Sequence, residues 1–223
     1  LAATNDIRDG MTYLSPGSNH YMNVYGDASW EIAGRESHTD FTETLCEADA
    51  ELPAIVGARG FSSHLIHFDT LHVLYRGVGP DFVASTLVLV FGQKLLPEAH
   101  ELARSWCRAQ GASLSVDDFT FSYEGRFPSL NAKGWDVRLL LLWLAEVVPG
   151  RTQGWADGEY AEVINMTVRA VAKSIRLMDE AEYVVPPEKI AKAEKYARHF
   201  LLGYMWLAFA ASTAGQKLFK IRP

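Results

Sequence analysis

A short segment, residues 63–80, concentrates the side chains that are most able to do chemistry. It contains His64, His67 and His72 together with Asp69, and a pair of glycines follows before a long apolar pattern begins. A carboxylate beside histidines can bind a divalent cation, act in an acid–base pair, or cap a turn. The first two possibilities make the segment a candidate site, and the third makes it an ordinary loop.

The histidines do not have the spacing of a zinc site. In a strand, His64 and His67 would point to opposite faces, whereas in a helix they would share a face, as would Asp69 and His72. A structural zinc site needs four ligands, and Cys46 is the only thiol near this segment in the sequence. We therefore expect His72 to be a hydrogen-bonded histidine that orients Asp69, rather than a zinc ligand.

A second carboxylate, Asp136, follows Trp135 at the predicted start of a buried helix. The N-terminal end of a helix carries a partial positive charge, so a surface carboxylate is favourable there. A carboxylate on this helix could also bind a metal ion together with a carboxylate at the end of an earlier strand. Sequence spacing does not choose between the two interpretations.

The glycines at Gly77 and Gly79 predict a tight turn, and Pro80 suits the first turn of the helix that follows. The glycine patterns of phosphate loops and dinucleotide sites are absent, as are a serine elbow and the paired-histidine motif of zinc proteases. We therefore interpret these glycines as structural.

The 223-residue chain has an ordinary globular composition, with 48% hydrophobic and 22% charged residues. Its 21 Lys and Arg against 27 Asp and Glu give a formal net charge of -6. This balance argues against a domain whose main role is to hold a nucleic-acid backbone, although it leaves room for a local basic groove. The cysteines, Cys46 and Cys107, are too few for a disulfide framework and suit a reducing, intracellular compartment.

Hydrophobic periodicity predicts an α+β protein that is predominantly helical, with strands and loops in residues 1–75 and helices in residues 76–216. A short extended piece is expected at Phe119–Tyr123, and residues 217–223 are expected to fray. Helices are predicted to begin at Pro80, at Pro97, near Asn131, after an Asp157 cap, and near Pro187. The helix from Asn131 is expected to be apolar all round and to stop at Pro149.

We expect residues 1–223 to form one domain, and to be a fragment of a longer protein because the chain begins at Leu1 rather than at a methionine. No charged and then apolar leader is visible, so the sequence predicts no secretion signal. The longest apolar run, Phe200 to Ala211, is shorter than the roughly 20 residues that cross a bilayer. No membrane partner is therefore expected, and the oligomeric state stays open.

Several stretches together resemble a known family. His67–His72, followed by Gly77–Gly79 and a helix, resembles a segment of transposase-like proteins related to the CACTA and Plavaka-type DDE transposases, which are abundant as degenerate copies in dinoflagellate genomes. His38–Phe41, the link from Phe119 to Leu130, and Lys133–Leu139 resemble further segments of the same proteins in the same order. The resemblance covers roughly residues 28–145.

The resemblance implies a truncated ribonuclease H-like core with a helical C-terminal half. In that family, carboxylates hold Mg²⁺ or Mn²⁺ ions for phosphodiester cleavage and strand transfer on DNA, in the nucleus. By position, Asp69 matches the second acid and Asp136 the third, with His72 as a supporting catalytic residue. The first acid has no clear match in this chain.

Two other functions fit the same residues. The acidic balance and the incomplete set of acids favour a non-catalytic helical interaction or structural module derived from such an element. An unrelated soluble hydrolase could instead use Asp69 and His72 as an acid–base pair.

Overall fold

The computed structural model describes residues 43, 54, 56, 58–60, 70–124, 126–180 and 185–221. The chain divides between Asp69 and Thr70 into two units, and the second unit, Thr70–Pro223, contains most of the described residues. Asp69, His64 and His67 lie outside the described residues, as do Cys46 and the strands expected near the start of the chain. The single domain expected over residues 1–223 stays a prediction.

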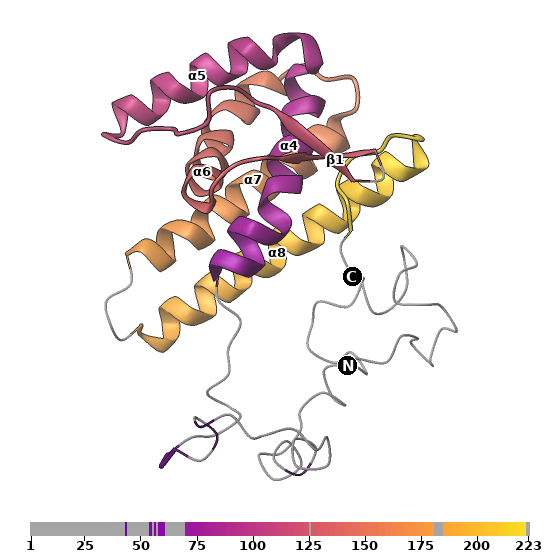
Figure 1. The fold of residues 1–223 in the computed structure, drawn as a ribbon. Helices are drawn as coiled ribbons and strands as arrows, with labels where there is room; N and C mark the ends of the chain where they lie inside the picture. The colour runs from indigo at the N-terminus through magenta and orange to yellow at the C-terminus, as the bar shows by residue number, and fades with distance from the viewer. Residues whose placement is uncertain are drawn as a thin grey trace. The chain divides into compact units, whose positions relative to one another are not determined.

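The second unit is mostly helical with one small sheet, so the predominantly helical α+β class is confirmed (Figure 1). Its helical elements are η2 (Leu71–Val78), α4 (Gly79–Phe91), η3 (Gln93–Leu95), α5 (Leu96–Ala109), α6 (Gly134–Arg151), α7 (Gly158–Asp179) and α8 (Pro187–Thr213). The strands β1 (Phe121–Glu124) and β2 (Phe127–Leu130) form an antiparallel hairpin between α5 and α6.

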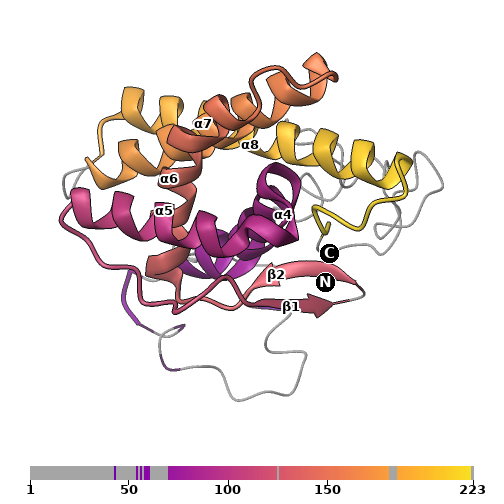
Figure 2. The same ribbon diagram turned by 90° about the horizontal axis from the view of Figure 1, so that it is seen from above.

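Two helices, α4 and α6, form the centre of this unit. Helix α6 packs against α4 and α7, α8 packs along α7, and β2 packs against α4. The hairpin and the α7–α8 pair therefore lie on opposite sides of the central helices (Figure 2). The run Leu139–Leu144 of α6 is buried throughout, as its apolar composition predicts. Each leucine fully removed from water there contributes about 1.5–3 kcal/mol to folding.

The tight turn predicted at Gly77–Gly79 is instead a kink between two helices, because the backbone angles of Gly77 are not helical. The π-helix η2 runs directly into α4, with a kink at Gly77 (φ −91°, ψ −106°) and a hydrogen bond from the Gly79 amide to the Leu74 carbonyl. A Cβ added at Gly79 would lie 2.9 Å from Cγ1 of Val137 on α6. The same Cβ would lie 2.5 Å from the Leu74 carbonyl oxygen, so both the kinked backbone and the packing against α6 require glycine here.

Helix boundaries follow local signals at some ends and depart from them at others. Asp157 caps α7 as predicted, because its side chain accepts a hydrogen bond from the amide of Tyr160. Helix α6 does not stop at Pro149 but continues through it to Arg151. The extended piece predicted at Phe119–Tyr123 is partly confirmed by β1, but its partner β2 was not predicted.

The segment that follows α8 is not frayed as far as the structure describes it. Leu218 and Phe219 are both buried, so the prediction of a frayed, solvated end is wrong for residues 217–221. The lysines of this segment and its short length predicted a solvated end, and they did not indicate that Leu218 and Phe219 pack in the core.

By length and composition alone, the continuous helix Leu71–Phe91 could cross a membrane, and the described part of the chain has one such helix. Half of the most apolar 18-residue stretch of this helix is buried within the fold, and α4 lies in the core. Burial among other helices accounts for this apolar composition without a bilayer. The expectation of no membrane partner stays a prediction.

Helices α7 and α8 approach each other very closely at one point. A Cβ added at Gly203 of α8 would overlap the hydroxyl of Thr167 and lie 3.0 Å from its Cβ. We predict that Gly203→Ala lowers the free energy of unfolding by about 1–3 kcal/mol, because overpacking forces the helices apart. Urea denaturation followed by circular dichroism measures the change.

The matched control is Gly150→Ala, where nothing lies within 4 Å of an added Cβ. This control is expected to be neutral or to stabilise the protein by up to about 1 kcal/mol, since alanine favours a helix over glycine. Equal effects of the two substitutions would contradict the proposed helix contact.

Tyr160 of α7 makes the stability of the protein sensitive to alkaline pH. Burial, and secondly the charge of Asp157, raise the pKa of its phenol from 10.0 to about 12. Between these pH values the unfolded chain releases a proton that the folded chain keeps, so the free energy of unfolding falls as the pH rises.

The phenol oxygen of Tyr160 is buried and lacks a hydrogen-bond partner among the described residues. Tyr160→Phe is therefore expected to preserve stability at pH 8, because it deletes an unsatisfied buried group. It should also reduce the loss of stability between pH 10 and pH 12, the interval set by the two pKa values. Urea midpoints of both proteins across this range test the prediction, and identical pH slopes would refute it.

Candidate functional site around Asp136

Asp136 lies in the first turn of α6 and its side chain is fully buried. One carboxylate oxygen, Oδ1, accepts a hydrogen bond of 2.7 Å from the amide of Ser115. The other, Oδ2, accepts one of 2.6 Å from the Ser115 hydroxyl. A single serine in the link between α5 and β1 therefore engages both oxygens of this carboxylate.

These contacts offset the cost of burying a carboxylate. Hydrogen bonds to a charged acceptor are stronger than neutral ones, and they replace part of the water that the carboxylate loses. The position of Asp136 in the first turn of α6 adds the favourable partial charge of the helix end. The arrangement fastens the link to the core.

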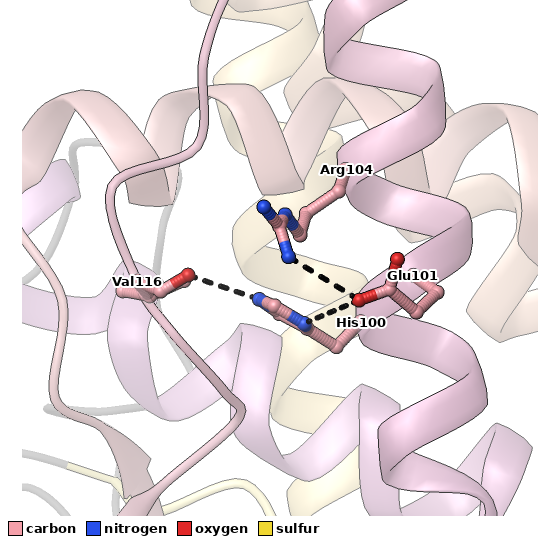
Figure 3. Close-up of polar contacts among 4 residues, drawn as sticks. All are labelled: His100, Glu101, Arg104 and Val116. Carbon is pink, nitrogen blue, oxygen red and sulfur yellow. Dashed lines mark hydrogen bonds and ion pairs between the residues drawn. The ribbon is translucent and has the colours of Figure 1, made fainter.

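A buried histidine, His100, forms a second hydrogen bond to the link, at the residue that follows Ser115 (Figure 3). Nε2 of His100, on α5, donates a hydrogen bond of 3.0 Å to the carbonyl of Val116. Nδ1 of the same ring lies 3.7 Å from Oε1 of Glu101, which also pairs with Arg104 at 3.3 Å. The ring meets Phe119 edge-on, with 5.2 Å between centroids. His100 thus holds the link from the α5 side.

The thiol of Cys107 lies in the same neighbourhood, on the buried face of α5. Burial, and secondly the charge of Asp136, raise the pKa of this thiol. The thiolate is the reactive form of cysteine, so both effects oppose reactivity. Cys107 is therefore a core side chain.

The predicted site residues differ in their exposure and in whether the structure describes them. Asp136 is buried, His72 is exposed on η2, and Asp69 lies outside the described residues. The support of Asp69 by His72 and the pairing of Asp69 with Asp136 both stay predictions.

The described residues do not by themselves form a metal centre. Among them, no group of three or more His, Cys, Asp or Glu could hold a metal ion. A two-metal site needs several carboxylates that share the ions, and both oxygens of Asp136 are already bonded to Ser115. Any metal bound by Asp136 would have to compete with these two hydrogen bonds.

An exposed aromatic surface lies beside Asp136, at the start of α6. Trp135 is 55% exposed, and the guanidinium of Arg138 lies 4.9 Å from its ring centroid. Arg138 also pairs with Asp179 at the end of α7. Leu71 reaches the same helix start, since a Cβ added at Gly134 would lie 2.5 Å from its Cδ1. We call Leu71, Trp135 and Arg138 the Trp135 surface.

Sequence reasoning missed the partners of Asp136 and of the link. His100 had a signal, because it shares a helical face with Ala103 and Cys107, which indicates burial. No sequence signal indicated the role of Ser115, because it is 21 residues from Asp136 and no local pattern joins the two residues.

Comparisons of the chain with protein-family models, with curated proteins and with solved structures found no match.

The Ser115–Asp136 contact predicts the effect of removing one hydroxyl. Ser115→Ala deletes the donor to Oδ2 and leaves a buried carboxylate oxygen without it. We expect the free energy of unfolding to fall by about 1.5–3 kcal/mol, the range for hydrogen bonds to charged groups. Chemical denaturation measures the loss.

Ser113→Ala is the matched control, because Ser113 lies in the same link and is exposed as Ser115 is, whereas the hydroxyl that donates to Oδ2 of Asp136 is that of Ser115. A surface substitution of this kind changes stability by no more than about 0.5 kcal/mol. A loss at Ser115 no larger than that at Ser113 would show that Asp136 does not depend on the serine hydroxyl.

Proposed function

We propose that residues 70–221 are a non-catalytic helical interaction module of a transposase-derived protein. In this proposal the hairpin and the helices around it are the remaining part of a truncated ribonuclease H-like core. The environment of Asp136 is the observation that carries the proposal. Both of its carboxylate oxygens accept hydrogen bonds from Ser115, and its side chain is fully buried. A carboxylate that fastens a link in the core has a structural role that does not require a metal ion.

The Trp135 surface supports a binding role. Tryptophan and arginine are enriched among the residues that dominate protein interfaces, and Trp135 and Arg138 are stacked on each other at the surface. The pair of Arg138 with Asp179 holds the guanidinium in place, so the surface is partly organised before a partner arrives.

The family resemblance favours a second candidate, a DDE-type nuclease and strand transferase. In that proposal, Asp69 and Asp136 bind Mg²⁺ or Mn²⁺, His72 supports Asp69, and the enzyme acts on DNA in the nucleus. The position of Asp136 at the start of a helix that follows the Lys133 segment is the feature that favours it.

A cleavage assay separates the two candidates. A labelled DNA duplex is incubated with the chain and with Mg²⁺ or Mn²⁺, alongside Asp69→Ala, Asp136→Asn and the control Asp117→Ala, whose residue is exposed in the link. If the chain is an interaction module, Asp69→Ala and Asp136→Asn should not reduce metal-dependent cleavage relative to the unmodified chain, because neither residue has a catalytic role. All four proteins are checked for folding by circular dichroism.

Cleavage by the unmodified chain and the control, lost in folded Asp69→Ala and folded Asp136→Asn, would overturn the non-catalytic proposal and establish the nuclease. Cleavage lost in Asp69→Ala but retained in Asp136→Asn would instead support the hydrolase that uses Asp69 with His72.

A further inference from the structure

The segment 216–221 returns from the end of α8 across the core. In Figure 2 it is the yellow coil that runs back from α8 toward the hairpin. Residues 212–217 are all exposed, whereas Leu218 and Phe219 are buried. The segment is therefore joined to α8 by a solvent-exposed connection, and its burial in the core begins only at Leu218.

Phe219 occupies an aromatic pocket between α4 and α8. Its ring centroid lies 6.0 Å from that of Phe82 on α4 and 5.9 Å from that of Tyr204 on α8. Phe200 closes the pocket, with its ring edge-on to Phe82 at 5.1 Å. Phe219 itself is 1% exposed, so the pocket encloses the whole side chain.

Side chains of the two helices also hold the backbone of the segment. The amide of Phe219 donates a hydrogen bond of 2.8 Å to the hydroxyl of Ser85, which is fully buried on α4. The hydroxyl of Tyr204 donates one of 2.6 Å to the carbonyl of Lys220. Hydrogen bonds to the main chain of a segment, together with a pocket for one of its side chains, are the contacts by which proteins bind peptides.

Two further features belong to the same contact. Nζ of Lys217 lies 5.6 Å from the ring centroid of Phe127 on β2, a cation–π geometry. Phe219 has φ +55°, which a bulky side chain adopts only where its surroundings hold it. The pocket and the Ser85 bond supply that restraint.

We propose that α4 and α8 form a peptide-recognition groove. Its ligand is a segment bent at a phenylalanine, which is preceded by leucine and flanked by lysines. The chain's own segment 216–221 occupies the groove here, and the same segment of a second copy takes its place on exchange. Gly215, with φ +70° in the exposed connection, is the hinge for that exchange. This inference goes beyond the proposed function and does not rest on it.

The test separates the segment from the folded chain after folding is complete. A specific protease site is inserted in the exposed connection between Thr213 and Gln216, the full chain is purified, and it is then cut. A fluorescent peptide of residues 216–223 is added, and anisotropy follows its binding. The groove predicts that the cut segment exchanges with the peptide in a saturable way, while circular dichroism of the remaining chain is unchanged.

Two variant peptides define the specificity. A Phe219→Ala peptide should bind roughly 100-fold more weakly, the order expected when a buried phenylalanine is lost. A Gln216→Ala peptide should bind as the unmodified one does, because Gln216 is exposed. Failure of the cut segment to exchange, loss of structure on its release, or equal binding of the Phe219→Ala peptide would each overturn the proposal.

A second measurement avoids the inserted site. Full-length Phe219→Ala lacks the ring that fills the pocket, so its own segment competes less strongly than that of the unmodified chain. It should therefore bind the unmodified peptide at least about tenfold more tightly than the full-length unmodified chain does. Equal binding by the two full-length chains would contradict a groove that the segment occupies.

Discussion

The close approach of the helix over residues 71–91 to α6 is the contact on which the other elements depend. It requires small residues on both sides: Gly79 lets Val137 pack against the backbone, and Gly134 lets Leu71 do the same from the other helix. With these helices in contact, the apolar run of α6 is covered by α4 on one side and α7 on the other. The hairpin and α8 then complete the burial.

The same contact determines what Asp136 can do. Because α6 begins against η2 and α4, the side of its first turn that carries Asp136 is buried, and a carboxylate there must find hydrogen-bond donors within the protein. Ser115 supplies them, and His100 holds the adjacent residue Val116. A long link without secondary structure is thereby kept against the core. The charge at Asp136 has a structural use whether or not it ever had a catalytic one.

The aromatic cluster at the other side of α4 is completed late in the chain. Phe82, Phe200 and Tyr204 would leave an apolar hollow at the surface if Phe219 were absent. Phe219 reaches this core on a short segment that an exposed connection joins to α8. The contact of Phe219 with this cluster is held by two hydrogen bonds and one ring rather than by a helix interface.

The sequence by itself determined the predominantly helical class, the buried run of α6 and the Asp157 cap of α7, because each depends on residues within a few positions of one another. Only the tertiary structure decided that the chain kinks at Gly77 between two helices, that Phe127–Leu130 pairs with β1, that Ser115 bonds Asp136, and that Phe219 is core. Ser115 and Asp136 are 21 residues apart, and Ser85 and Phe219 are 134 apart. Such contacts form where packed helices bring distant groups together, and no local periodicity encodes them.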